Sequence, residues 1–180
     1  MNDIVFGRVA GLIWSARPSA IASWLLIWAA LAVIGAAVLS WSWPVALGMA
    51  FCATVIYVLS EASHQLGHAI AARGTGYPMT GVRFWGPLAS SLYPEDEPAL
   101  PPAIHVRRAL GGPIASALIS VLAGIWVAIT GWGNEPMARL AQFVFLLNLL
   151  VYTLQVFVPL GFNDGGTLAR WLPQLLKGES

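Results

Sequence analysis

Four long apolar segments dominate the chain. A helix that crosses the roughly 30 Å hydrocarbon core of a bilayer needs about 20 apolar residues, and each segment is that long. The first carries no charged residue and lies too far into the chain to be a cleaved signal peptide. The pattern predicts an all-α membrane protein of one domain, residues 1–180, with four transmembrane helices. We place these helices at about 20–40, 44–70, 110–132 and 138–160.

The connection between the second and third segments has a different composition. Residues 74–108 hold six of the twelve prolines of the chain and an acidic run at 95–97. Their first part, MTGVRFWGPLASSLY, places β-branched and aromatic residues on both sides of Gly86 and Pro87. Such residues around a Gly-Pro turn predict a short β-hairpin, which we expect at the membrane interface.

The overall composition excludes several classes of protein. Apolar residues make up 58% of the chain and charged residues only 9%, against roughly a quarter charged in an average soluble domain. Disorder needs low hydrophobicity with high net charge, and a nucleic-acid-binding surface needs excess cations, whereas nine Lys and Arg here are balanced by eight Asp and Glu. The single cysteine, Cys52, lies in an apolar run and is expected to be a small buried residue. The lipid bilayer is therefore the expected partner, and nucleic acid is not.

The distribution of cations predicts the orientation in the membrane. Once four spans are drawn, eight of the nine Lys and Arg fall on one side and only Arg139 falls on the other. Cytoplasmic segments carry the excess of Lys and Arg, so both termini and the loop 74–108 are predicted to be cytoplasmic, in a plasma or inner membrane. The eight residues are Arg8, Arg17, Arg73, Arg83, Arg107, Arg108, Arg170 and Lys177.

Candidate chemistry is concentrated at the inner end of the second segment, in the run EASHQLGH. His64 and His68 are four residues apart, so a helix projects both imidazoles from one face, at a spacing that lets them bind one zinc ion. Glu61 lies nearly on the same face, within reach of a contact to either imidazole. The alternative is that the histidines are hydrogen-bonded residues of a helix bundle.

A third ligand is available after the fourth segment. Asp164 is followed by two glycines, which allow a tight turn that brings its carboxylate back toward the helices. Two His and one Asp leave a zinc ion an open position for water, as in a catalytic site. The alternative role for Asp164 is to cap a short helix over 167–176.

These residues resemble three motifs of the site-2 protease family of intramembrane zinc metalloproteases, in the same order. The run HQLGH resembles the HExxH helix, Gly112-Pro113 resembles the pair that opens the next core helix, and Pro159 with Asp164 resembles the NxxPxxPLDGG segment. The resemblance covers about 44–170. It implies zinc held by the two histidines and the aspartate, hydrolysis of a peptide bond in or near a transmembrane segment, a β-hairpin after the HExxH helix, and a first span added to a three-helix core.

The sequence also departs from the family pattern. The general-base Glu of HExxH is replaced by Gln65, whose amide has no titratable group near pH 7, so an acid–base contribution of roughly 10² to 10⁴ in rate should be missing. The family's Asn falls at Val156, its second Pro at Phe162 and its Leu at Asn163, which removes the Asn that helps the family to position its substrate. Three interpretations of Gln65 are open: a naturally divergent and catalytically silent relative, a Glu→Gln change made to trap an inactive enzyme, or Glu61 serving as the base instead.

A polar stripe follows the fourth segment. Asn148, Tyr152 and Gln155 fall at i, i+4 and i+7, so we expect them to face the other helices. They would either hydrogen-bond between helices or line a polar groove for an unwound substrate.

The predicted function is that of a site-2-protease-like zinc metallopeptidase that is weakly active or inactive because of Gln65. Two other classes are open. One is a non-catalytic membrane protein that binds transmembrane segments or other membrane partners, with the histidines and Gln65 hydrogen-bonded across helices. The other is a small transporter, which is less favoured because four spans with one polar cluster give no continuous path across the bilayer.

Overall fold

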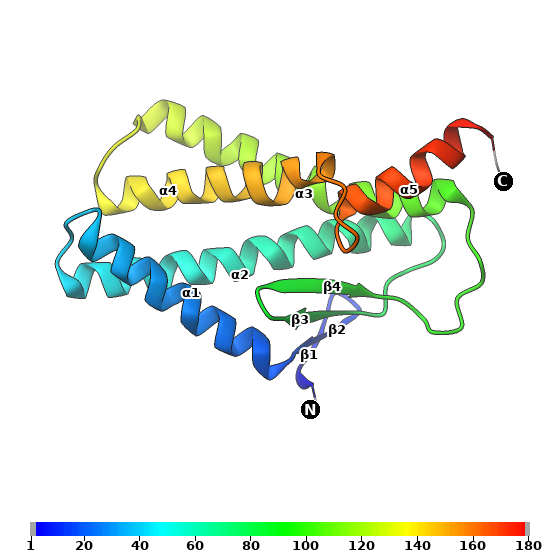
Figure 1. The fold of residues 1–180 in the computed structure, drawn as a ribbon, viewed down its shortest axis with the longest axis horizontal. Helices are drawn as coiled ribbons and strands as arrows, with labels where there is room; N and C mark the ends of the chain where they lie inside the picture. The colour runs from blue at the N-terminus through cyan, green and yellow to red at the C-terminus, as the bar shows by residue number, and fades with distance from the viewer. Residues whose placement is uncertain (1–2, 179–180) are drawn as a thin grey trace.

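The computed structural model describes residues 3–178, and Figure 1 shows a bundle of helices with a small sheet against one side. The helices are α1 (Pro18–Ala37), α2 (Trp43–Arg73), α3 (Pro102–Thr130), α4 (Pro136–Leu146) and α5 (Asp164–Leu176). The strands are β1 (Ile4–Val9), β2 (Leu12–Ala16), β3 (Gly81–Trp85) and β4 (Leu88–Leu92). After α4 the chain continues as a π-helical segment, Leu147–Thr153, and a 3-10 turn, Leu154–Phe157.

Four helical stretches are long and apolar enough to cross a membrane, which confirms the predicted architecture of four membrane helices. They are Pro18–Ala37, Trp43–Arg73, Pro102–Thr130 and the run Pro136–Phe157. The third begins eight residues before its predicted start, because its first turns are polar and hydropathy alone does not include them. Each stretch has a proline at its first or second position, where the missing N–H has no helical partner to lose.

Cys52 lies exposed on the outside of α2. The expectation of a buried residue is therefore wrong. An apolar residue of a membrane helix can face lipid as readily as it faces another helix, because lipid tails are as apolar as the bundle interior.

The sheet has four strands in the order β1-β2-β3-β4. The predicted hairpin is β3–β4, an antiparallel pair that turns at Gly86 and Pro87. A second antiparallel hairpin, β1–β2, joins it through a parallel pairing of β2 with β3 and is missing from the sequence-based prediction. Its signal is the apolar, β-branched run on both sides of Ala10 and Gly11, which both adopt positive φ at the turn.

A cluster of buried apolar side chains lies between the sheet and the first two helices. Leu12 and Val82 from neighbouring strands pack with Ala20 of α1 and with Ala69 and Ala72 of α2. This core fixes the sheet against the inner half of α2, the half that carries the two histidines.

Glycines bring α2 and α3 into close contact. A Cβ built on Gly111 would lie 2.5 Å from the carbonyl oxygen of Gly67, a distance that real Cβ atoms do not reach. Small residues at such a crossing let two helix backbones approach each other in a membrane. The run Gly111–Ala117 therefore packs α3 against the face of α2 that bears the histidines.

A partly buried ion pair fixes the loop between β4 and α3. The guanidinium of Arg108 donates to both carboxylate oxygens of Glu97, at 3.0 and 2.6 Å, and to the carbonyl oxygen of Tyr77 at 2.6 Å. It also lies 4.0 Å from the ring centroid of Tyr93. The hydrogen bonds from Arg108 hold the pKa of Glu97 below its ordinary value of 4.5.

We expect Glu97→Gln to lower the free energy of unfolding by about 2 kcal/mol, the usual contribution of a hydrogen bond to a charged group. The glutamine side chain keeps one oxygen that accepts from Arg108. Its NH₂ group replaces the second oxygen and faces the guanidinium, which only donates. Thermal or denaturant unfolding in detergent at pH 7 measures the loss, with the exposed Glu95→Gln as the matched control.

The same pair predicts a pH dependence. Because folding lowers the pKa of Glu97, its contribution is complete above the unfolded-state value of 4.5 and is lost as the pH falls through the lower folded-state pKa. The difference between the wild type and Glu97→Gln should therefore shrink in acid. A difference that stays constant down to the lowest pH at which the protein folds would contradict this account.

Candidate metal centre

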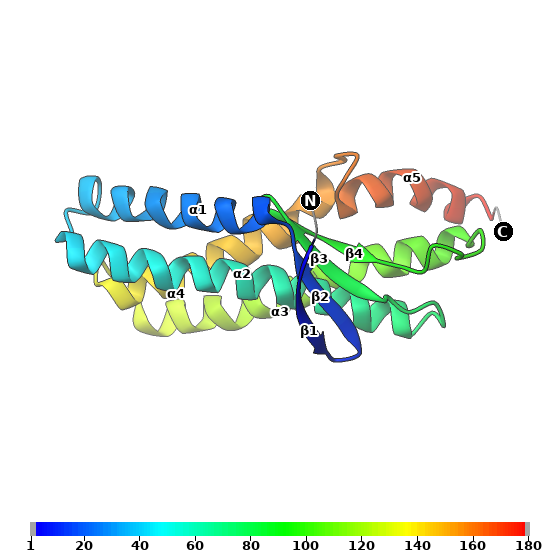
Figure 2. The ribbon, with the colours of Figure 1, turned by 90° about the horizontal axis from the view of Figure 1, so that it is seen from below.

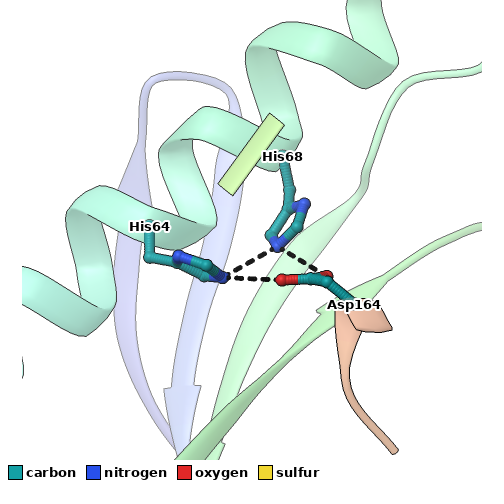
Figure 3. A group of neighbouring side chains, drawn as sticks. All are labelled: His64, His68 and Asp164. Atoms are coloured by element: carbon teal, nitrogen blue, oxygen red, sulfur yellow. Dashed lines mark hydrogen bonds and ion pairs between the residues drawn. The ribbon is translucent and has the colours of Figure 1, made fainter. Parts of the chain in front are cut away.

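His64 and His68 lie one turn apart on α2 and point at the first turn of α5, which carries Asp164 (Figure 3). The two Nε2 atoms are 3.1 Å apart. Asp164 places Oδ2 at 3.1 Å from His64 Nε2 and Oδ1 at 3.3 Å from His68 Nε2. Both histidines are buried. The fold thus brings together the three residues that the sequence singled out, from segments about 100 residues apart.

The geometry of these three atoms fits a metal ion. Zinc binds imidazole nitrogen and carboxylate oxygen at about 2.0–2.1 Å, and a tetrahedron of that size separates its ligand atoms by roughly 3.3–3.4 Å. The observed separations of 3.1–3.3 Å are close to those values. Burial would raise the pKa of Asp164, but its close contacts with the two imidazoles outweigh burial and lower the pKa below its ordinary value. The centre is therefore a buried anion beside two imidazoles, a group that could hold a metal ion.

Contacts behind the imidazoles determine which nitrogen faces the centre. His68 Nδ1 lies 2.8 Å from the carbonyl oxygen of Arg108 and 3.2 Å from the backbone nitrogen of Gly112. These contacts turn its Nε2 atom toward Asp164. In the neutral tautomer that donates from Nδ1 to the carbonyl, Nε2 carries the lone pair that could bind a metal ion. His64 Nδ1 lies 3.0 Å from the buried hydroxyl oxygen of Ser116. Partners of this kind orient metal-binding histidines and raise their basicity.

Asn163, and not Asp164, caps α5. The Asn163 side chain accepts a hydrogen bond from the backbone N–H of Gly166 at 2.9 Å, and the helix begins at Asp164 itself. The alternative that Asp164 caps a helix over 167–176 is therefore wrong. Its carboxylate faces the histidines and accepts a hydrogen bond from Gln155 Nε2 at 2.7 Å. Gln155, the last residue of the predicted polar stripe, thus orients the third ligand.

Gly112 leaves room for the centre on the α3 side. A Cβ at this position would lie 2.5 Å from His64 Nε2 and 2.7 Å from its Cε1 atom. Any side chain at position 112 would therefore push against the ligand atoms, which gives the Gly-Pro pair of the sequence a physical role.

Gln65 is bonded to the sheet. Its Nε2 donates to Glu61 Oε1 at 3.3 Å and to the Ala89 carbonyl oxygen at 3.4 Å, and its Oε1 accepts from Ser91 Oγ at 2.8 Å. Glu61 Oε1 also accepts from the backbone N–H of Ala89 at 3.1 Å. The polar groups of Ala89 on the edge strand β4 are thus bonded by two side chains of α2. Glu61 bonds to Gln65 and β4 rather than to an imidazole.

A cavity of about 520 Å³ opens beside the ligands. It lies between α2, β4, the π-helical segment and the start of α5, and its volume is typical of ligand-binding sites. Tyr152 is buried on its wall. Asn148, one turn earlier, is fully buried and donates to Ser60 Oγ at 3.1 Å. The predicted polar stripe therefore faces the other helices, as expected.

The arrangement of the whole chain matches a solved structure, Site-2 Protease from Methanocaldococcus jannaschii, with a TM-score of 0.64. The match covers 97% of this chain and 73% of that one, at 16% sequence identity. The chain has a site-2-protease-like fold. This confirms the resemblance at the level of the fold, and the cluster of His64, His68 and Asp164 could hold a metal ion within that fold. No protein family and no curated protein matches the sequence.

Several groups around the candidate metal centre are missing from the sequence-based prediction. The Ser116 hydroxyl had a signal, because a polar side chain in an apolar helix near a proposed metal site is expected to face the interior. The Arg108 carbonyl and the polar groups of Ala89 had none, because backbone groups leave no trace in residue identity. Only the packing of α2 against α3 and β4 shows their positions.

We expect Gly112→Ala to abolish metal binding by the purified protein, because the added methyl group would stand at the ligand nitrogens. The matched control is Gly48→Ala, also in a helix, where a Cβ meets nothing within 4 Å. Metal analysis of the two variants measures the effect, and circular dichroism confirms that both keep their helices. Full metal content in Gly112→Ala would contradict this placement of the ligands.

Proposed function

We propose that this chain is a zinc-binding intramembrane metallopeptidase of the site-2 protease type in which peptide hydrolysis is weak or absent. The buried triangle of His64, His68 and Asp164 carries the proposal, because its atoms are spaced for one tetrahedral ion and open onto a cavity. The substrate class is a peptide segment in or next to the membrane. The excess of cations on one side supports a position with both termini and the loop 74–108 in the cytoplasm.

The residues of the chain have separate roles in this proposal. Zinc, when bound, would polarise a scissile carbonyl and lower the pKa of a bound water. His64 and His68 hold it as neutral donors, and Asp164 supplies the negative charge. Gln155 orients the carboxylate through its hydrogen bond. The hydroxyl of Tyr152, on the cavity wall, could donate a hydrogen bond to a polar group that enters the cavity.

Gln65 accounts for the low rate in two ways. Its amide cannot take a proton from water, which removes general-base catalysis. Its hydrogen bonds also hold the side chain against Glu61 and Ala89, toward the sheet. A glutamate in the same rotamer would place a carboxylate oxygen about 3.3 Å from Glu61 Oε1 and 3.4 Å from the Ala89 carbonyl oxygen, where like charges repel. The surroundings are suited to an amide, which supports natural divergence over a change made in an otherwise unaltered enzyme.

The same contacts support a second candidate, a non-catalytic protein that binds membrane segments. Glu61 and Gln65 together bond the N–H and carbonyl groups of Ala89 on an edge strand that lines the cavity. The chain would then hold a metal and a membrane segment without cleaving it.

The experiment that tests the proposal combines Gln65→Glu with Glu61→Gln. We expect the double variant to hydrolyse labelled casein in detergent 10²-fold or more faster than the wild type, in line with the usual range of about 10² to 10⁴ for a general base. The single Gln65→Glu variant should gain less, because its new carboxylate lies against Glu61. Zinc content is measured in every variant so that loss of metal is not mistaken for loss of chemistry.

Two outcomes would contradict parts of this proposal. A wild type as active as the double variant would show that the amide at position 65 does not limit the rate. If all three proteins held metal but were inert, the result would favour the non-catalytic candidate.

A further inference from the structure

The N-terminal hairpin carries an apolar surface that the metal centre does not explain. Every residue of β1 is exposed, and its large side chains Ile4, Val5, Phe6 and Val9 are 44–64% exposed. Ile13 on β2 adds a further exposed apolar side chain. In water, such a patch on an edge strand favours aggregation, so a surface of this kind normally meets a partner.

The hairpin lies at the level where the first membrane helix begins. Only Arg17 separates the end of β2 from the start of α1. Figure 2 shows β1 and β2 running across the helices rather than along them, beside the first turn of α1. A hairpin in this position lies in the plane where α1 enters the bilayer. The exposed apolar side chains of α1, among them Leu25 and Leu26, continue outward from the same level.

Charge around the hairpin is positive. Arg8 is exposed on β1, and the side chain of Arg17 is about half exposed. Arg73 reaches across from α2 to donate to a carbonyl at the hairpin turn. The nearby carboxylate, Asp3, is shared between Arg83 at 2.7 Å and Arg17 at 3.7 Å, so one negative charge lies among several arginines. A surface that combines apolar side chains with an excess of arginines is complementary to anionic lipid headgroups.

The free edge of β1 limits how deep the hairpin can lie. Within residues 3–178, the sheet ends at β1, so one side of this strand has unpaired backbone groups. Open sheet edges do not occur in contact with hydrocarbon, whereas the headgroup layer supplies water and polar partners. We propose that the β1–β2 hairpin is a membrane-surface anchor that lies in the anionic headgroup layer of the leaflet at the N-terminal end of α1. This anchor is independent of the metal centre.

The test measures the depth of a single label. Val5→Cys is made in a Cys52→Ala background, labelled with an environment-sensitive fluorophore and placed in nanodiscs of phosphatidylglycerol or phosphatidylcholine. We expect blue-shifted emission, stronger in phosphatidylglycerol, and several-fold stronger quenching by a nitroxide at headgroup level than by one at the end of the acyl chain. The matched control is Asp96→Cys in the exposed acidic loop, which should emit as it does in water.

Each alternative gives a distinct result. Water-like emission from Val5, equal to that from Asp96, would overturn the proposal. Stronger quenching by the deep nitroxide would place the hairpin in hydrocarbon and would also overturn it. Coverage by a second copy of the chain would appear as self-quenching between two labels with no response to lipid quenchers, and would also overturn the proposal.

A second variant tests the role of lipid charge. In the labelled protein, Arg8→Glu should reduce the difference in emission between phosphatidylglycerol and phosphatidylcholine. An unchanged difference would contradict the anionic component of the proposal.

Discussion

The close approach of α2 and α3 at Gly67 and Gly111 sets the geometry of the centre. With no side chain between the two backbones, the imidazoles on α2 reach α3 and find a hydroxyl and a carbonyl group there as hydrogen-bond partners. Gly112 then leaves the space in which their free nitrogens meet Asp164. Polar groups inside a membrane must find partners within the protein, so a site of this kind is stable only where the helices are this close. Arg108 links the centre to the rest of the fold, because its carbonyl orients His68 while its guanidinium holds the acidic loop.

The residue at position 65 changes the site beyond the loss of one titratable group. An amide can donate and accept at once, and Gln65 uses both capacities to join α2 to the edge strand β4. Glu61, one turn earlier, completes this link by accepting from the Ala89 N–H. The Glu61 carboxylate is thus bonded to the sheet, and an amide stands at the position where the HExxH motif has its glutamate. Under the proposed function, metal binding and acid–base chemistry would therefore be separable in this chain.

Much of the fold and of the candidate centre could be predicted from the sequence. Hydropathy predicted the four membrane helices, and the spacing of His64 and His68 with a later Asp164 predicted the three residues that meet in the candidate centre, because helix periodicity and ligand type are visible in residue identity. The N-terminal hairpin was missed since its two strands are short and the apolar segment after them dominates the pattern. Which residue caps α5 could not be decided between neighbouring Asn163 and Asp164, because both side chains are good caps and only the packing against Gln155 separates their roles.

The measurement that tests the central claim most directly is the zinc content of the purified, detergent-solubilised protein after metal-replete preparation. It is made beside His64→Ala, Asp164→Ala and, as a control, His105→Ala, a histidine that stacks on Trp171 outside the centre. We expect about one zinc ion per chain in the wild type and in His105→Ala, and loss of the metal in the other two variants, since three protein ligands are needed for a site of this type. A wild type without zinc, or zinc retained when His64 and Asp164 are each removed, would contradict the account.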